Sequence, residues 1–571
     1  MSYSRDQRAA RRRITVSLLT SDLIRRRLVR FNAAQAGVLL FVLAVFTVML
    51  VFPLGTLFSK AFTASGKFIG FANYRKYFNT PSLSVSVWNT ILISLVTTAF
   101  SSVFGFLYAY AITRTGIPGK TFFKYTALLP IFIPTVVHAL GLVYIFGKQG
   151  IITRLGFDIS LYGRNGIIIS EIIYTFPQAF LLFLVALEYA DGRLYEACTA
   201  MGVKPAGQFF HVTLPEIKYT AFNTVFVCFT LAFTDFGAPK VIGGNYNVLA
   251  TDIYKQIAGK FNMNMGAVVG TLLLIPAIIS FVAGRFVPEK NASTLNAKTI
   301  PLAIVKKPAR DILFFLFCCL VALCFIFLTA SLFAGALTRY YPYDMSFTLK
   351  HFAFNKSAGG IESYFNSILM SLATVAFGTA FVFLYAYMME KSEGFGLLTR
   401  YGRLLAVLPL AVPGLVVGLS YIFFFNMRSN PFHFLYGTVG ILVLSNITHY
   451  FSVPYLGATG ALLKLDREFE SAAESMGIPR WKTLLRVSVP LSFNAIVETA
   501  MYFFVNSMVT VSALVFLYTA QFKIASVAIT HMEEAGDISH AAAMSLLILF
   551  INVAVRVLYE AVIRINRKNK H

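Results

Sequence analysis

Several polar side chains stand inside long apolar stretches of this 571-residue sequence, and they have the clearest capacity for chemistry. Lipid excludes free carboxyl, imidazole and amide groups, so residues of this kind mark a path for a polar solute or pair with one another. Asp235, in FTDFGAPK, is the first candidate for such a path. The complete set is His138, Glu171, Asp235, Asn446, His449, Glu498 and Asn506. For each residue the alternative role is a hydrogen bond between helices or a helix cap.

One short segment, RTGIPGKT at 114–121, approaches a phosphate-binding loop and would imply ATP hydrolysis by the chain itself. That motif requires Gly where Arg114 stands, a preceding strand and a following helix. Apolar spans flank the segment on both sides instead, and no metal-ligand cluster or nucleophile–His pair stands out in the sequence. The chain is therefore predicted to have no catalytic residue and to bind no metal ion or cofactor of its own.

Membrane helices must position these residues, because 57% of the sequence is hydrophobic and only 13% is charged. So few charges cannot cover several soluble domains of this total length. Five cysteines, an odd number, also argue against a disulfide scaffold. The predicted fold class is an all-α membrane protein. Twelve segments of about 20 residues or more, the length that a bilayer requires, are predicted to span it: 35–58, 86–112, 125–147, 166–188, 219–238, 265–285, 311–337, 364–388, 404–426, 436–461, 494–518 and 540–561.

The net charge of +24 fits this membrane topology. An even number of spans places both termini on one side, and most of the 49 Lys and Arg residues fall on that side. Positive residues are retained in the cytoplasm, so both termini are predicted to be cytoplasmic. The tail at 1–34 holds nine of these residues. A nucleic-acid-binding arm is the alternative, but the apolar span that follows favours contact with anionic lipid headgroups and no nucleic-acid partner.

The sequence contains one unit twice. WNTILISLVTTAFSSVFGFLYAY begins at Trp88, and FNSILMSLATVAFGTAFVFLYAY begins at Phe365, 277 positions later. The copies cover spans 2–6 and 8–12, and both start from the outer side, so they are predicted to run parallel with a shared pathway between them. Spans 1 and 7 stand outside the repeat. Prolines and glycines near the pathway candidates are predicted to break helices, namely Pro134, Gly141, Pro413, Gly414 and Gly418.

These observations predict seven consecutive parts of the chain. They are a basic cytoplasmic tail at 1–34, the first span with an outer loop at 35–83, the first repeat at 84–287, a cytoplasmic linker at 288–310, the seventh span with an outer loop at 311–360, the second repeat at 361–562 and a basic cytoplasmic tail at 563–571.

The cytoplasmic loops between spans 4 and 5 and between spans 10 and 11 have matching sequences. In each, a short helix of small residues ends at a glycine, Gly202 or Gly477, and a proline follows within three positions. Glycine accepts the left-handed conformation that ends a helix, and proline prevents its continuation. Each loop is therefore predicted to form a rigid protruding hook. Two capped surface helices are the alternative for one loop, but two matched copies favour a docking element.

These loops resemble the EAA motif of ABC importer permeases, in which Glu-Ala-Ala precedes three residues and Gly, and a hydrophobic-x-Leu-Pro ending follows. The first copy contains Glu196, Ala197, Cys198, Gly202, Leu214 and Pro215. The second copy departs from the motif, because Ser471 stands at the Glu position. Its residues are Glu470, Ser471, Ala472, Ala473, Glu474, Gly477, Val489 and Pro490.

The resemblance implies an ATP-driven importer in which this chain supplies both transmembrane halves of the type I permease fold. It implies that the hooks seat in two copies of a cytoplasmic ABC ATPase, that ATP and Mg²⁺ bind only to that ATPase, and that an extracytoplasmic binding protein delivers the cargo. The wording of FTDFGAPKVIGG and FVNSMVTVSALVFLY is most similar to the ferric-iron and 2-aminoethylphosphonate branch. It favours 2-aminoethylphosphonate or another small phosphonate or phosphate compound, with ferric iron as the alternative.

Two other classes of membrane protein fit the sequence less well. A major facilitator transporter also has two parallel six-span halves, but it would need an Asp-Arg-rich loop where this chain has ITRTGIPGKTF, and it would have no matched hooks. An intramembrane enzyme would need paired catalytic groups within the bilayer, and the sequence offers none at a convincing spacing.

Overall fold

The computed structural model describes residues 33–568, except 65, 158–159, 189, 287–301, 303, 355–358, 393–394 and 467. The predicted basic tail at 1–34, apart from Ala33 and Ala34, and most of the predicted linker at 288–310 lie outside the described residues. The described chain is helical throughout, apart from loops and two short antiparallel hairpins. The hairpins pair β1 (Thr63–Ala64) with β2 (Lys67–Phe68) and β3 (Thr338–Tyr340) with β4 (Asp344–Phe347).

One long helix precedes the first half of the molecule, which we define as α3 to α14. That helix is α2 (Ala33–Ala61). The elements of the first half are α3 (Ala72–Phe78), α4 (Pro81–Arg114), α5 (Lys120–Leu128), η1 (Leu129–Phe132), α6 (Thr135–Phe146), α7 (Ile151–Arg154), α8 (Arg164–Glu188), α9 (Gly192–Ala200), α10 (Pro205–Gln208), η2 (Phe209–Thr213), α11 (Leu214–Thr234), α12 (Gly237–Ile242), α13 (Leu249–Tyr254), η3 (Lys255–Gly259) and α14 (Met263–Phe286).

A second long helix, α15 (Pro308–Leu337), and the short η4 (Lys350–Phe352) precede the second half, which we define as α16 to α26. Its elements are α16 (Glu362–Lys391), α17 (Gly396–Val407), η6 (Leu408–Ala411), α18 (Gly414–Phe425), η7 (His433–Leu435), α19 (Val439–His449), α20 (Ser452–Leu463), α21 (Glu468–Ser475), α22 (Arg480–Thr483), η8 (Leu484–Ser488), α23 (Val489–Leu491), α24 (Phe493–Val509), α25 (Ala525–Glu534) and α26 (Ile538–Lys568).

Among the described residues, eight helices are long and apolar enough to cross a membrane, and eleven spans result if each of three bent helix pairs counts as one. A shorter apolar helix at 263–279 lies at the sixth predicted span. Large apolar side chains stay exposed along α15, as lipid contact requires, among them Leu313, Leu316, Leu320 and Leu323. The prediction of an all-α membrane protein is confirmed.

Prolines break the third and ninth predicted spans. Pro134 and Pro413 directly precede α6 and α18, each after a short 3₁₀ turn, and the helix formed by α17 and η6 meets α18 at a bend of 112°. Proline has no N–H for the helical hydrogen bond and clashes with the preceding turn. Gly141 does not break its helix. A Cβ at Gly141 would fall against Leu328 of α15, and the Ser331 hydroxyl donates to the Gly141 carbonyl at 3.2 Å, so this glycine permits close helix packing.

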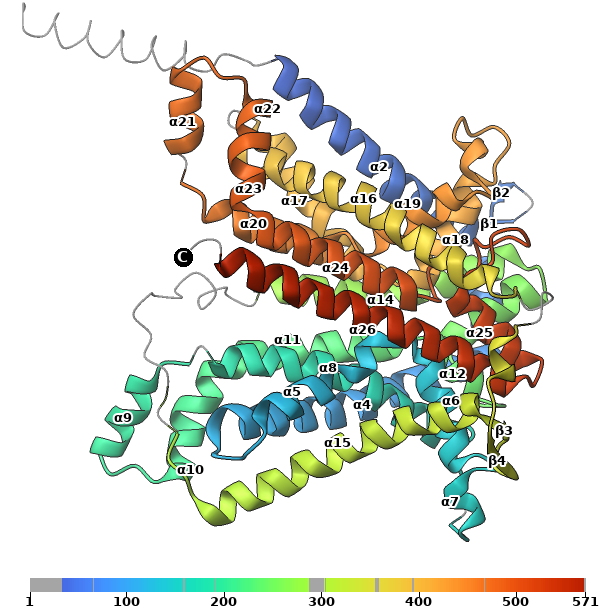
Figure 1. The fold of residues 1–571 in the computed structure, drawn as a ribbon. Helices are drawn as coiled ribbons and strands as arrows, with labels where there is room; N and C mark the ends of the chain where they lie inside the picture. The colour runs from blue at the N-terminus through green and yellow to red at the C-terminus, as the bar shows by residue number, and fades with distance from the viewer. Residues whose placement is uncertain are drawn as a thin grey trace, which may run out of the picture.

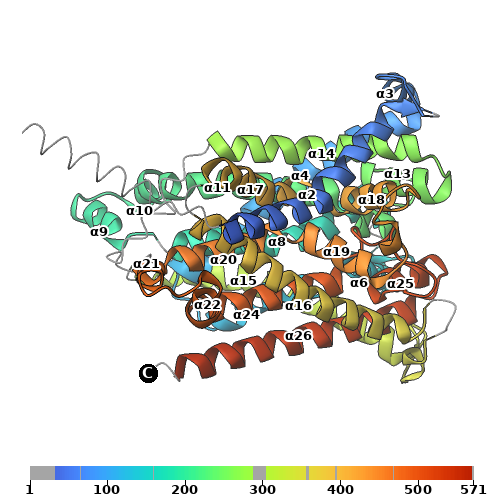
Figure 2. The same ribbon diagram turned by 90° about the horizontal axis from the view of Figure 1, so that it is seen from above.

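The two halves run in the same direction, as the repeat predicts. Figure 1 shows α9 and α10 of the first half, in green, at the same end of the molecule as α21 and α22 of the second, in orange. We call this the hook end; α12, α25 and the β3–β4 hairpin lie at the opposite end. The start of α2 and the end of α26 also lie at the hook end. The view from above gives the same arrangement, with the long helices running between the two ends (Figure 2).

Equivalent contacts recur in both halves. The Leu249 backbone N–H donates to the Thr90 hydroxyl at 2.9 Å, and the Ala525 N–H donates to Ser367 at 2.8 Å. Thr90 and Ser367 are 277 positions apart, which is the offset of the sequence repeat. Each contact ties the short helix α13 or α25 to the long helix α4 or α16.

The two helices outside the repeat cross between the halves. α2 packs against α16, α17, α18 and α19 of the second half, as well as α14 of the first, and its Phe46 ring lies 4.0 Å from Phe451 and 5.5 Å from Tyr385. α15 packs against α4, α5 and α6 of the first half, as well as α26 of the second, and its Phe325 lies 5.3 Å from Phe176. In Figure 1, α2 accordingly lies with the yellow and orange helices and α15 along the cyan and green ones. Each half is therefore clasped by a helix from the other part of the chain.

Candidate functional site

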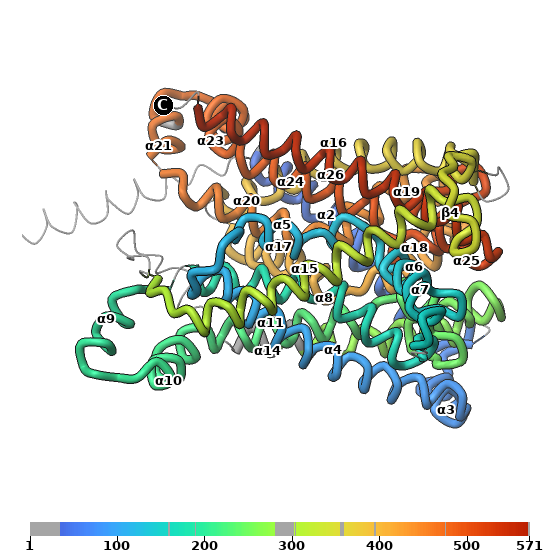
Figure 3. Tube along the Cα trace, turned by 60° about the horizontal axis from the view of Figure 1, so that its bottom comes forward, coloured from blue at the N-terminus to red at the C-terminus, as the bar shows by residue number. Residues whose placement is uncertain are grey.

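Each predicted hook consists of two short helices that meet at a glycine turn. The first hook, residues 191–215, contains α9, Gly202, α10 and the π-helical turn η2, which continues into α11. The second hook, residues 466–490 with 467 outside the described residues, contains α21, Gly477, α22 and the π-helical turn η8. The tube in Figure 3 shows the two hooks as separate projections at one end of the molecule. One local sequence pattern thus builds the same element twice.

The glycine turns have the same backbone geometry. Gly202 has φ +72° and Gly477 has φ +69°, in the left-handed region that side chains with a Cβ avoid. Directly after each turn, the Val203 N–H donates to the Cys198 carbonyl and the Ile478 N–H to the Ala473 carbonyl, both at 2.9 Å. These bonds satisfy carbonyls that the end of a helix leaves free.

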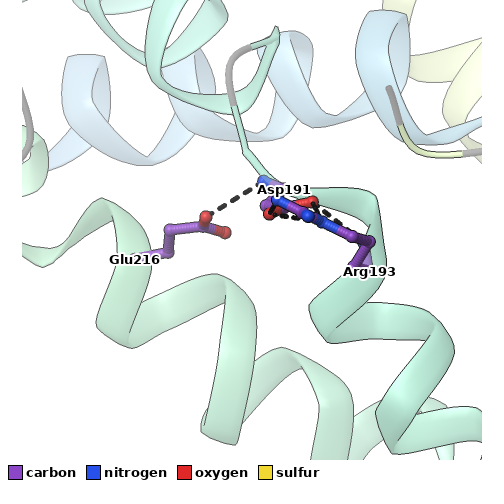
Figure 4. Close-up of polar contacts among 3 residues, drawn as sticks. All are labelled: Asp191, Arg193 and Glu216. Atoms are coloured by element: carbon purple, nitrogen blue, oxygen red, sulfur yellow. Dashed lines mark hydrogen bonds and ion pairs between the residues drawn. The ribbon is translucent and has the colours of Figure 1, made fainter. Parts of the chain in front are cut away.

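The first hook is fastened to its own half by polar contacts at its base. The Asp191 N–H donates to Glu216 Oε1 of α11 at 3.2 Å, and the Asp191 carboxylate pairs with Arg193 at 2.6 Å (Figure 4). The Tyr195 hydroxyl contacts the Thr213 hydroxyl at 2.9 Å. The guanidinium of Arg114, the last residue of α4, lies 5.1 Å from the Tyr195 ring, at cation–π distance.

The second hook is fastened at the equivalent positions by different chemistry. Lys391, the last residue of α16, lies 277 positions after Arg114, and its Nζ pairs with Glu470 at 3.1 Å. Glu470 stands at the position of Tyr195. Arg480 donates to the side chain of Gln35 in α2 at 2.5 Å and to the Lys391 carbonyl at 3.2 Å. In both halves, therefore, the last cation of the long helix holds the hook.

We expect Lys391→Met to loosen the second hook and leave the first unchanged. The Lys391 side chain is 6% exposed, so its removal leaves Glu470 with an unpaired charge, at a cost of about 3–5 kcal/mol. Hydrogen exchange of peptides from 468–488 should become faster, while exchange of 192–213 stays as in the parent chain. Arg193→Gln, which removes an exposed ion pair from the first hook, is the control and should change exchange little. Unchanged exchange of 468–488 in Lys391→Met would contradict the anchoring role.

The two hooks expose apolar side chains at the same three positions. Leu194, Met201 and Phe210 are exposed in the first hook, and Phe469, Met476 and Leu485 occupy the matching positions, 275 later, in the second. Both methionines are about 70% exposed. A groove of about 650 Å³ in the second hook lies beside Phe469, Ala472, Met476 and Ile478, with Lys482 and Arg486 at its edge. Exposed apolar groups with a charged rim are typical of a protein-binding surface.

The residues predicted from the EAA resemblance occupy several environments. Those exposed on the hooks are Glu196, Ala197, Gly202, Leu214, Pro215, Ser471, Ala472, Gly477 and Pro490. Cys198 and Ala473 are buried beneath them, and Val489 is half-buried. The side chain of Glu474 lies outside the described residues. Glu470 pairs with Lys391 inside the chain, so it anchors the hook and does not stand free toward a partner.

Between the halves, five side chains form a second candidate site, which we call the interhalf cluster: Glu171 and Tyr174 of α8, Asp235 after α11, Tyr450 after α19 and Tyr502 of α24. Tyr174 interacts electrostatically with each of the other four. The rings of Tyr450 and Tyr502 lie 6.1 Å apart. The cluster therefore joins two predicted pathway residues of the first half to phenols of both halves.

Glu171 and Asp235 lie in direct side-chain contact. Asp235 Oδ2 accepts a hydrogen bond from the Ala238 N–H at 3.0 Å, and the Thr135 hydroxyl also donates to this carboxyl group. Glu171 is fully buried, and neither of its carboxyl oxygens receives a hydrogen bond from an N–H or hydroxyl group of the described residues. Asp235 thus accepts a hydrogen bond at the start of α12, as a helix cap does, whereas Glu171 has no such structural partner.

The remaining pathway candidates lie around the cluster or apart from it. The His138 ring lies 6.4 Å from Tyr174, and the His449 ring lies 4.5 Å from Tyr450. Asn446 is buried and donates to the Met370 sulfur at 3.6 Å, and Asn506 donates to the Tyr502 carbonyl at 2.8 Å. Glu498 is exposed on α24, near Tyr559 of α26, and lies outside the cluster.

Sequence reasoning missed the three tyrosines of the cluster. Tyr174 in SEIIYTF lies three positions after Glu171, and Tyr450 in SNITHYF directly follows His449, so their closeness to predicted candidates was the available signal. It was overlooked because tyrosine is a common residue in membrane helices and has no charge.

At the opposite end, one ion pair joins the two halves. Lys240 of α12 lies 2.5 Å from Glu534 of α25, and its ammonium also lies 4.6 Å from the Tyr254 ring. The ring of Tyr254, in the first half, stacks on Phe516 of the second at 6.1 Å. A hydrogen bond from His531, together with Lys240, lowers the pKa of Glu534 to about 2. We call the Lys240–Glu534 contact the outer bridge.

Comparison with known proteins identifies the fold. Residues 101–287 and 394–568, more than half of the chain, match the family of binding-protein-dependent transport system inner membrane components. Each matched block contains one hook. The chain is 27% identical to the ferric transport system permease protein FbpB of Actinobacillus pleuropneumoniae over 493 residues, which cover 83% of this chain and 70% of that protein.

Two further relatives support the assignment. The putative ferric transport system permease protein FbpB 1 of Haemophilus influenzae is 28% identical over 456 residues, covering 77% of this chain and 71% of that protein. The probable ABC transporter permease protein y4fN of Sinorhizobium fredii is 24% identical over 527 residues, covering 89% and 92%. Permeases of this kind work with an ATPase and a substrate-binding protein, and they are multi-pass inner membrane subunits and not enzymes. The chain therefore belongs to the binding-protein-dependent inner membrane permeases of ABC importers, with both permease halves joined in one polypeptide.

Proposed function

We propose that each hook binds one copy of a cytoplasmic ABC ATPase and transmits its movements to the membrane helices. The matched exposure of apolar side chains at three positions in both hooks supports two identical docking sites. The anchors from Arg114 and Lys391 support transmission, because a force on the hook acts directly on α4 and α16. In this proposal ATP and Mg²⁺ bind to the partner ATPase, and the present chain contributes no catalytic group.

The proposal places the hook end in the cytoplasm, together with both termini. The excess of Lys and Arg in the segments on that side of the sequence supports this orientation. An extracytoplasmic binding protein then delivers cargo to the opposite end, where the outer bridge joins the halves. Cargo passes between the halves when the bridge opens.

We propose ferric iron as the cargo, in place of the phosphonate that the wording of the sequence favoured. Two relatives that align with more than three quarters of this chain are named ferric transport permeases. The interhalf cluster places two carboxyl groups side by side without a cationic side chain in contact with either among the described residues, which suits a cation better than an anion.

The test is reconstitution of this chain in proteoliposomes with its ATPase and its binding protein. Ferric iron supplied on the binding protein should stimulate ATP hydrolysis and should accumulate in the lumen. 2-Aminoethylphosphonate is the competing cargo in a parallel assay. Stimulation and uptake with the phosphonate alone would overturn the iron assignment, and stimulation by neither would overturn both cargo assignments.

We expect Glu534→Gln to raise ATP hydrolysis in the absence of binding protein by about fivefold. A half-buried ion pair contributes about 1 kcal/mol, and its loss favours opening at the outer end by that factor. The matched control is the exchange Lys240→Glu with Glu534→Lys, which restores opposite charges and should return basal hydrolysis to the parent value. Equal basal rates in all three chains would show that the bridge does not hold the halves together.

The outer bridge should make basal ATP hydrolysis by the parent complex vary little when the outer pH changes between about 5 and 8. A carboxyl group whose pKa is lowered on folding contributes stability above its ordinary value, here 4.5, and loses it as the pH falls through about 2. Burial raises the pKa of the neighbouring Glu533 to about 7, and Glu533→Gln serves as the control for its titration. A transition near neutral pH that persists in Glu533→Gln would contradict a permanently charged bridge.

A further inference from the structure

Hydrogen bonds and ion pairs among the described residues do not explain the composition of the interhalf cluster. Glu171 is completely buried, yet no N–H or hydroxyl donor of the described residues reaches its carboxyl oxygens, and its polar contact is a second carboxyl group, that of Asp235. Two buried carboxylates in contact repel each other, so the pair is stable only with a shared proton or a bound cation.

The groups around this pair are also oxygen donors. Tyr174, from the first half, interacts with both carboxyl groups and with Tyr450 and Tyr502 of the second half, which also interact with each other. No group of three His, Cys, Asp or Glu suited to a metal ion occurs among the described residues, so the cluster is no resident metal centre of that usual kind. Two carboxyl groups with three phenols form an oxygen-rich set, which hard multivalent cations prefer over nitrogen and sulfur ligands.

The position of the cluster allows its ligands to separate. Glu171, Tyr174 and Asp235 belong to the first half and Tyr450 and Tyr502 to the second, so a movement between the halves would change the distances between their oxygens. A transported ion must be held firmly enough to enter and weakly enough to leave. A ligand set that divides along the moving interface meets both requirements.

We infer that Glu171, Asp235, Tyr174, Tyr450 and Tyr502 form a transit site for a hard trivalent cation, which displaces the proton shared by the two carboxyl groups when it binds. This inference rests on the proposed function, since it names the site through which the proposed cargo passes. Carboxylate and phenolate ligands bind metal in their deprotonated form, so binding releases protons. Return of protons to the carboxyl pair and to the phenolates that bound the ion then accompanies its release.

The first experiment detects the ion at the cluster in the complex of this chain with its ATPase. Ferric nitrilotriacetate should produce the visible phenolate-to-iron charge-transfer absorption, and gallium nitrilotriacetate should compete for the site without absorbing. Tyr450→Phe with Tyr502→Phe should remove most of the absorption. Tyr559→Phe, at a half-buried position of α26 near Glu498 and outside the cluster, is the control and should retain it. No absorption in the parent complex, or equal absorption in the double variant, would overturn the transit site.

The second experiment separates the transit site from the proposed function. Glu171→Gln keeps the size of the side chain and should lower iron uptake about tenfold or more, as the loss of a metal ligand does. Complex assembly and stimulation of ATP hydrolysis by the loaded binding protein should persist. Glu188→Gln, on the exposed end of the same helix, is the matched control. If the parent complex imports iron and Glu171→Gln imports it equally well, the transit site is wrong and the importer stands. If the parent complex imports no iron, the cargo assignment fails first.

Discussion

A chain carrying both Gly202→Pro and Gly477→Pro should insert in the membrane normally but give no ATP hydrolysis in response to loaded binding protein. Both glycines have φ near +70°, whereas the proline ring fixes φ near about −65°, a conflict that costs about 3 kcal/mol or more at each turn. The hooks must therefore abandon their helix–turn–helix geometry. The measurement is the ratio of stimulated to basal ATP hydrolysis in proteoliposomes, which should fall to one.

The control for this variant changes the same glycines without changing the backbone. Asn is the residue that best tolerates the left-handed conformation after glycine, and a Cβ at either position meets no atom within 4 Å. Gly202→Asn with Gly477→Asn should therefore keep most of the stimulation. Full stimulation in the double proline variant would show that the hooks do not transmit force.

Met201→Asp with Met476→Asp should abolish stable binding of the ATPase. These methionines are about 70% exposed at matched positions, and a carboxylate buried in an apolar groove without a partner costs several kcal/mol. Each single variant should retain one docking site and so a weaker complex. Co-purification of the ATPase with the tagged chain, followed by size-exclusion chromatography, measures the loss.

The comparison variant is Phe68→Asp, which places the same charge on an equally exposed apolar residue of the β1–β2 hairpin at the opposite end. It should retain the ATPase in full. Retention of the ATPase by the double methionine variant would locate the docking surface elsewhere.

Much of the fold follows from local sequence signals. Apolar length predicts the spans, Pro134 and Pro413 predict the two broken helices, and Gly202 and Gly477 predict the turns of the hooks, because each of these effects depends on a few neighbouring residues. The repeat offset then predicts that both hooks occur at one end of the molecule. The comparison with the permease family confirms the class of protein that these signals indicate.

The contacts between the two halves could not be predicted from local sequence signals. Nothing near Lys240 indicates that Glu534, almost 300 positions later, is its partner, and nothing in α2 indicates that Phe46 packs on Phe451. The interhalf cluster shows both cases. Asp235 and Glu171 can be identified from the sequence as charged residues in apolar spans. Tyr450 can be identified only from the structure, because its role depends on its interaction with Tyr174 of the other half. Long-range pairing depends on the path of the whole chain, which local pattern does not specify.

The mutual clasp of α2 and α15 has a consequence for how this protein is encoded. Each of these helices packs on the half that the other part of the chain builds, so a cut between α14 and α15 would leave two fragments that still grip each other. Two separate genes, one ending after α14 and one beginning before α15, should therefore give a working pair without any covalent tether. Co-expressed fragments should purify together through a tag on either one.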